Sequence, residues 1–201
     1  MAIYTSDAFN RSDENPIADP WTEVNNGGTW PVLSSSQVTS NNGTWNAWCY
    51  NTSESWNANQ ISSIKLTSTP GSGNGGGPAV RCSGTTDSDV RGYSLYVTGT
   101  TSARVYAIYP PDESSDTLAT ITYPFASGDV LSIQIVGYVI TVTCNGKVIW
   151  SGTDSNSRNA SGSPGFVIDG TATMDDWWAG DPTTHDQALR FKVSLRTDGV
   201  G

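Results

Sequence analysis

The stretch that most constrains the fold spans residues 129–153, DVLSIQIVGYVITVTCNGKVIWSGT, where apolar and polar side chains alternate. A period of two residues is typical of a β-strand with one buried face. Asn145-Gly146 interrupts the alternation, and this dipeptide tolerates the positive φ angles of a two-residue type I′ hairpin turn. The pattern predicts three consecutive antiparallel strands, at 130–136, 138–144 and 147–151. One face of this meander is half apolar, so it requires a second sheet to cover it.

Length and composition indicate that the rest of the chain supplies this second sheet. The chain has 201 residues, of which 36% are hydrophobic and 14% charged, and it contains 21 glycines. A chain of this length buries roughly 70% of its unfolded surface, which is enough for one all-β domain. Runs of helix-forming residues are missing, and this favours a β-sandwich over a helix bundle. We therefore expect residues 1–201 to form a single domain.

Other short strands are predicted on both sides of the meander. They lie near 60–67, 78–83, 93–98, 103–109, 117–123, 165–168 and 189–195, with a short N-terminal edge strand and a hairpin within 29–40. The glycine-rich run at 71–78 is interpreted as a loop. These segments amount to roughly eleven to thirteen strands with little helix, as expected for a two-sheet antiparallel jelly-roll sandwich.

Charge, cysteine content and hydropathy exclude several classes of protein. The net charge is −9 and no basic stripe is present, so nucleic acid is not an expected partner. No window approaches the ~20 apolar residues of a membrane span, and residues 1–16 lack the pattern of a signal peptide. Three cysteines, at 49, 82 and 144, allow at most one disulfide, and a zinc site does not fit their spacing. We expect synthesis in a reducing cytosol and release by another route than ordinary secretion.

Several motifs spread over nearly the whole chain carry a resemblance to a known fold family. They are DAFNRSDENPIADPWTEV at 7–24, GPAVR at 77–81, GYSL at 92–95, the turn at 145–146, and DDWWAGD at 175–181. In these segments the chain resembles concanavalin A-like (laminin G-type) jelly-roll domains, in particular those of bacteriophage virion proteins and bacterial surface proteins. The resemblance implies a domain that binds carbohydrate or serves in adhesion or assembly; a minority of the family are glycanases or lyases.

The sequence lacks the catalytic motifs of an enzyme on this fold. Retaining glycanases carry a Glu-x-Asp-x-x-Glu strand, whereas none of the four glutamates here belongs to such a motif. The nearest carboxylate pair, Glu113 and Asp116, follows two prolines in what is interpreted as a solvated turn. His185 is the only histidine and lies in a polar loop. We therefore expect a protein that is not an enzyme.

Aromatic residues gather in one polar segment, NNGTWNAWCYNTSESWNANQ, which contains Trp45, Trp48, Tyr50 and Trp56. Sugar rings stack on aromatic planes, and neighbouring amides bind their hydroxyl groups. These four residues are therefore one candidate for a glycan groove. The alternative is that Trp48 and Tyr50, two positions apart, share one strand face and fill the sandwich core.

Carboxylates near the two ends of the chain suggest a second candidate site. Asp7 and Asp13 from one end could meet Asp175 or Asp176 from the other, with Asp169 nearby, and form an oxygen-rich structural Ca²⁺ site. This hypothesis depends on the resemblance, because the spacing matches no EF-hand loop. The alternative is that these are solvated aspartates in turns.

Three functions remain open from the sequence. The first is a virion decoration or surface-assembly protein that contacts protein partners, with an added role in carbohydrate binding. The second is a dedicated glycan-binding or receptor-binding module for cell-surface glycans. The third is a glycan-cleaving enzyme with an unrecognised site. We expect a location on a virion or an extracellular surface without membrane insertion, and homo-oligomers are compatible with all three functions.

Overall fold

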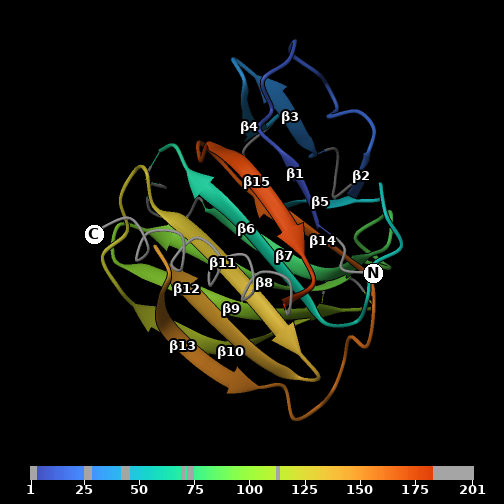
Figure 1. Cartoon of the computed structure of the whole chain (residues 1–201), viewed down its shortest axis with the longest axis vertical. Coiled ribbons are helices and arrows are strands. Elements are labelled where there is room, and N and C mark those ends of the chain that lie inside the picture. Colours follow the sequence, from blue (N-terminus) through green and yellow to red (C-terminus); the bar gives the residue numbers. More distant parts are fainter. Residues whose placement is uncertain are drawn as a thin grey trace, which may run out of the picture.

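The computed structural model describes residues 4–24, 29–41, 46–68, 71, 75–111 and 114–182. Within them the chain forms the strands β1 to β15, arranged in two antiparallel sheets. Figure 1 shows the larger sheet, with β6, β11, β12 and β15, in front of the smaller one. The predicted all-β antiparallel sandwich is therefore confirmed. The described part of the chain contains no helix that is long and apolar enough to cross a membrane.

The first sheet has eight strands. Its order is β13 (Lys147–Thr153), β12 (Val139–Cys144), β11 (Val130–Val136), β6 (Gln60–Leu66), β15 (Met174–Gly180), β4 (Gln37–Ser40) and β3 (Pro31–Ser34), and β1 (Tyr4–Asp7) also pairs with β15. The predicted meander forms one end of this sheet as β11, β12 and β13. At the turn between β12 and β13, Asn145 and Gly146 have φ angles of 52° and 76°, as a type I′ turn requires.

The second sheet has seven strands. Its order is β10 (Ser114–Thr122), β9 (Ser102–Tyr109), β8 (Arg91–Gly99), β7 (Gly76–Ser83), β14 (Ser163–Ile168), β5 (Ala47–Asn51) and β2 (Trp21–Val24). The inward side chains of the two sheets form one large core. This core includes Leu131, Ile133, Ile140 and Val142 from the meander, together with Leu95 and Val105 from the second sheet. Cys49, Cys82 and Cys144 are all buried as free thiols.

The glycine-rich run at 71–78 was wrongly expected to be a loop to its end, because β7 already begins at Gly76. A Cβ atom at Gly77 would lie 2.0 Å from the carbonyl oxygen of Leu95 on β8. No side chain fits at that distance, so the glycine marks a close approach of two strand backbones. The predicted strand at 189–195 lies outside the described residues.

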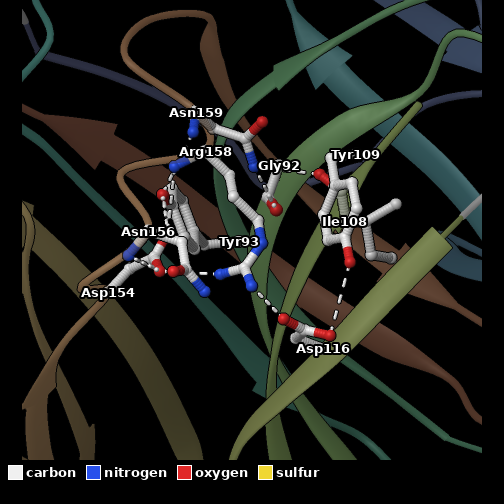
Figure 2. A network of polar contacts seen from close by, with 9 residues as sticks. All are labelled: Gly92, Tyr93, Ile108, Tyr109, Asp116, Asp154, Asn156, Arg158 and Asn159. Carbon is white, nitrogen blue, oxygen red and sulfur yellow. Dashed lines mark hydrogen bonds and ion pairs between the residues drawn. The ribbon is translucent and has the colours of Figure 1, made fainter. Parts of the chain in front are cut away.

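A polar network fixes the loop at 154–162, which connects β13 of the first sheet to β14 of the second (Figure 2). Asp154 is buried and accepts hydrogen bonds from the Tyr93 hydroxyl at 2.8 Å and from Nη1 of Arg158 at 2.8 Å. Asn159 donates through Nδ2 to the carbonyl oxygens of Gly92 and Ile108. The loop is therefore attached to β8 and β9 by side chains as well as by its ends.

Candidate functional site

The outward face of the eight-stranded sheet carries several exposed apolar side chains. The large hydrophobic side chains that are exposed in the described part of the chain all belong to strands of this sheet: Tyr4, Val130, Val136, Val139 and Val148. Exposed apolar side chains that gather on one face of a soluble protein indicate a binding surface. This face is therefore a candidate ligand-binding surface.

A groove of about 540 Å³ lies on this face. It is lined by Ile61, Val130, Ser132, Gln134, Thr141, Thr143, Asn145, Gly146, Val148 and Trp178. These residues come from five regions of the first sheet, namely β6, β11, β12, the β12–β13 turn with β13, and β15. None of the ten is charged, although the whole chain contains 19 acidic residues. The groove thus combines aliphatic, aromatic, hydroxyl and amide groups.

Strand register explains how residues from distant parts of the sequence meet in this groove. One row of paired positions crosses the sheet as Ser6, Trp178, Ser63, Ser132, Thr143 and Val148. The adjacent row is Tyr4, Gly180, Ile61, Gln134, Thr141 and Ser151. At about 4.8 Å per strand, each row of six strands spans roughly 24 Å. The two rows form an uncharged band that runs across the strands.

Trp178 supplies the aromatic surface of the groove. Its indole stacks on the ring of Tyr4, with centroids 6.0 Å apart and an interplanar angle of 24°. A β-bulge between Asp175 and Trp178 shifts the register of β15, so that Met174 and Trp177 both face the core. Trp178 consequently points to the opposite face, into the groove.

Hydrogen bonds between strands hold several of the polar groups in place. Ser132 donates through Oγ to Oγ of the buried Ser63 at 2.9 Å, and Ser63 donates to the carbonyl oxygen of Leu131 at 2.9 Å. Thr141 and Ser151 share a hydrogen bond of 3.1 Å between their hydroxyl groups. These contacts orient the hydroxyl groups before any ligand arrives, and this lowers the entropic cost of binding.

The aromatic residues predicted to line a groove are divided between two clusters of buried side chains in the described part of the chain. Trp48 is 1% exposed and belongs to a second buried cluster, on the outward side of the seven-stranded sheet. Tyr50 lies beside this cluster and donates its hydroxyl to the carbonyl oxygen of Gly84 at 3.1 Å. Val90, from the same loop as Gly84, also packs in the cluster. Trp48 and Tyr50 thus share one strand face, as the alternative held, but not the face toward the main core.

The other two predicted aromatic residues lie elsewhere. Trp56 packs against the main core, and its Nε1 donates to the carbonyl oxygen of Asn51 at 2.9 Å. Trp45 lies outside the described residues. The structure therefore brings Trp48 and Tyr50 together but separates them from Trp56, and their role in ligand binding stays a prediction.

The predicted calcium ligands have protein partners instead. Asp7 binds Nη1 of Arg11 at 2.8 Å and accepts from Nε1 of Trp21 at 2.8 Å. Asp176 forms an ion pair of 2.9 Å with Lys65. Burial raises the pKa of Asp175, which accepts a hydrogen bond from the backbone of Asp176. No group of three or more potential metal ligands is found in the described part of the chain, so the calcium site stays a prediction without support.

Of the three residues considered for catalysis, one lies within the described part of the chain. Asp116 lies on β10, where it pairs with Nη2 of Arg158 and accepts a hydrogen bond from the Tyr109 hydroxyl (Figure 2). Glu113 and His185 lie outside the described residues. Asp116 therefore belongs to the network that holds the loop at 154–162, and it is not among the residues that line the groove.

Sequence reasoning missed the groove although half of its signal was present. In the meander, the residues between the core positions include Ser132, Gln134, Thr141 and Thr143, and these form the polar part of the groove. Trp178 belongs to the motif at 175–181 and adjoins the carboxylates considered for calcium. The signal that could have found the site was therefore the exposed half of the alternation, since the tryptophan pair at 177–178 does not show which ring faces outward.

Comparisons with known proteins support the fold. No protein-family model matches the chain, and no curated protein matches it in sequence. Among solved structures, the chain is similar to carbohydrate-binding module CBM66 from Bacillus subtilis, at 14% identity and a TM-score of 0.61, covering 78% of this chain and 91% of that one. A prokaryotic β-1,3-1,4-glucanase (lichenase) derived from a mouse hindgut metagenome matches at 12% identity and a TM-score of 0.56, covering 89% and 99%.

A third similar structure is the exoplasmic/lumenal domain of VIP36 in its Ca²⁺/Man-bound form. It matches at 11% identity and a TM-score of 0.57, covering 80% of this chain and 82% of that one. At these identities the similarity concerns the fold alone. The chain has the concanavalin A-like jelly-roll fold that its sequence motifs resembled.

Proposed function

We propose that this chain is a non-catalytic carbohydrate-binding module that holds a glycan in the groove of the eight-stranded sheet. The observation that carries the proposal is the composition of the groove, where Trp178 adjoins a floor of hydroxyl and amide groups without a charge. The C–H face of a sugar ring stacks on an indole, and side chains such as Gln134 and Thr141 are suited to bind its hydroxyl groups.

The similar structures are compatible with this function. One of them is a carbohydrate-binding module, and another contains a bound sugar. Because a fold hosts many functions, these names support the proposal only together with the chemistry of the groove.

The glucanase among the similar structures raises the question of catalysis. Hydrolysis of a glycosidic bond normally requires two carboxyl groups, about 5–5.5 Å apart in retaining enzymes and about 6.5–9.5 Å apart in inverting ones. None of the ten residues that line the groove is an aspartate or a glutamate. The groove therefore offers the contacts of a binding site without the pair of groups that cleavage needs.

The setting of the module extends the proposal beyond the groove. The motif resemblance favours a place on a virion or on an extracellular surface, where the module would contact protein partners and present its groove to a cell-surface glycan. Self-association into homo-oligomers would increase avidity for a repeating polymer. These aspects rest on the sequence and are tested separately from glycan binding.

The test is retention of the purified protein on an array of glycans and cell-wall polysaccharides, alongside the variant Trp178→Ala. We expect selective binding that the variant loses while it keeps the far-ultraviolet circular dichroism of the parent. Trp56→Phe serves as the aromatic control, because Trp56 packs outside the groove. Folded protein that binds no glycan on the array would contradict the proposal and favour an assembly role.

A further inference from the structure

The strands that form the groove contain two cationic side chains, one of which borders the groove beside β15. Lys65 lies on β6 and pairs in register with Val130, which lines the groove. Strands β1, β6, β11, β12, β13 and β15 contain only one other lysine or arginine, Lys147, whose Nζ lies 5.7 Å from the ring centroid of Tyr123. Lys65 is therefore the ammonium group that an anionic ligand in this groove would meet.

Asp176 neutralises this ammonium group. Its Oδ2 lies 2.9 Å from Nζ of Lys65, and the side chains of both residues are partly exposed. The β-bulge in β15 places Asp176 at a φ angle of 50°, in the left-handed region that aspartate and asparagine tolerate better than most residues. The bulge thus serves two purposes, because it turns Trp178 into the groove and sets a carboxylate beside Lys65.

A second carboxylate gives this border a net negative charge. Asp175 is adjacent and accepts a hydrogen bond of 2.8 Å from the backbone nitrogen of Asp176. The side-chain hydrogen bond from Lys65 to Asp176 raises the pKa of the lysine, as expected for an ammonium group paired with a carboxylate. An anionic sugar at this border would meet the Lys65 ammonium already paired with Asp176, and the carboxylate of Asp175 close by. The net charge of −9 on the whole chain would repel it further.

We infer that the groove selects uncharged glycans over anionic ones, and that Asp176 is the residue that sets this selectivity by occupying Lys65. The inference rests on the proposed function, since it concerns the ligand class of the same groove. Without the Asp176 carboxylate, Lys65 would be available to a uronic acid or another carboxylated sugar. An exposed charge pair contributes little energy, so we expect a change in selectivity of a few fold, on the order of two- to fivefold.

The test uses one polysaccharide in two forms. A neutral polysaccharide retained on the array is compared with the same polymer after oxidation of its primary hydroxyl groups to carboxylates, at low and at physiological salt. The parent protein should bind the neutral form more tightly. Asp176→Asn keeps a residue that accepts the local φ angle, and it should shift the affinity ratio toward the oxidised form by about two- to fivefold, less at higher salt.

Two further variants separate the ion pair from general charge. The double variant Lys65→Gln, Asp176→Asn should show no shift in the affinity ratio toward the oxidised polymer, because the Lys65 ammonium is then absent. Asp87→Asn alters the net charge equally, but at an exposed loop position beside the seven-stranded sheet, and should cause no shift.

The outcomes distinguish the two proposals. If no polysaccharide on the array retains the parent protein, the proposed function fails, and this inference fails with it. If the parent binds the neutral form but binds the oxidised form equally well, or if Asp176→Asn behaves like Asp87→Asn, glycan binding stands and the role of Asp176 is overturned.

Discussion

Tyr4 and Trp178 come from opposite ends of the described chain, and their rings stack at 6.0 Å on the outward face of the eight-stranded sheet. The contact exists because β1 pairs with β15, which places Ser6 opposite Trp178 and Tyr4 opposite Gly180. Tyr4 is 59% exposed, so it does not serve to fill the core. Its ring instead supports one face of the indole beside the groove.

This stacking predicts a role for Tyr4 in glycan affinity. We expect Tyr4→Ala to weaken glycan binding by about two- to tenfold, because an aromatic pair contributes roughly 0.5–1.5 kcal/mol beyond the area it buries. Tyr4→Phe keeps the ring and should bind like the parent. Isothermal titration calorimetry with the glycan identified on the array measures both. Equal losses in the two variants would show that the hydroxyl, not the ring, matters.

Gln134 provides a second test at the centre of the band. Its side chain lines the groove between Ile61 and Thr141, its register partners on the two neighbouring strands. Gln134→Ala removes one side chain that can form a hydrogen bond with the ligand. Such a bond contributes about 0.5–1.5 kcal/mol, so the affinity for the glycan should fall by roughly two- to tenfold, with little change in the stability of the protein.

Gln37 offers the matched control for this variant. It lies on β4 of the same sheet, outside the groove, and its Oε1 accepts a hydrogen bond from Thr67. Gln37→Ala should leave glycan affinity unchanged. A loss of affinity in the Gln37 variant as large as in the Gln134 variant would place the ligand elsewhere on the sheet.

The parts of the fold that could be predicted from the sequence are those in which the cause is local. Apolar and polar residues alternate without a break along β11 and along β12, and the core positions Leu131 and Ile133 are buried as that alternation requires. The turn at Asn145 depends on the φ preferences of two adjacent residues. Periodicity and turn chemistry both act within a few residues, so one sequence reveals them.

Strand β15 could not be predicted in the same way. Its bulge inserts Asp176 between the core residues Met174 and Trp177, so apolar and polar residues do not alternate along MDDWWAG. The tryptophan pair therefore gave no indication of which ring faces the core. The bulge is stabilised by pairing with β6, which is far away in the sequence, and this pairing decides that Trp178 faces the groove.

The candidate site depends even more on distant pairing. Trp178, Ser132 and Thr143 share one row only because β15, β6, β11 and β12 are neighbours in the sheet. The environment of the predicted aromatic residues also depends on distant parts of the chain. Trp48 is covered in the second cluster that includes Val90, which belongs to another part of the chain.

The position of Trp48 predicts that its variants act through stability. Removal of a fully buried tryptophan side chain typically costs about 3–5 kcal/mol, so Trp48→Ala should strongly lower the midpoint of urea unfolding. Trp48→Phe should be milder and, where folded, should bind glycan like the parent. A folded Trp48→Phe variant without glycan binding would instead support the aromatic site inferred from the sequence.

The buried carboxylate of Asp154 in the network of Figure 2 makes the stability of the fold depend on pH. Burial raises the pKa of Asp154, but other interactions outweigh this effect and hold the pKa below its ordinary value. These interactions are hydrogen bonds from the Arg158 backbone, the Tyr93 hydroxyl and the Asn156 backbone, together with the positive charge of Arg158. The unfolded chain has the ordinary value, about 3.9. Ionised Asp154 therefore stabilises the fold above about pH 4, and this contribution is lost as the pH falls through the lower pKa of the folded state.

Asp154→Asn should remove this contribution. At pH 7 we expect the variant to be less stable by about 1.5–3 kcal/mol, the usual worth of hydrogen bonds to a charged group. Below about pH 4, protonation of Asp154 weakens its hydrogen bonds in the parent as well. The difference in the free energy of unfolding between parent and variant, measured by urea unfolding, should therefore narrow at low pH. Asp87→Asn, at an exposed loop position outside the network, should match the parent at both pH values. A difference of constant size from pH 7 to pH 3 would mean that the shape of Asp154, not its charge, holds the loop.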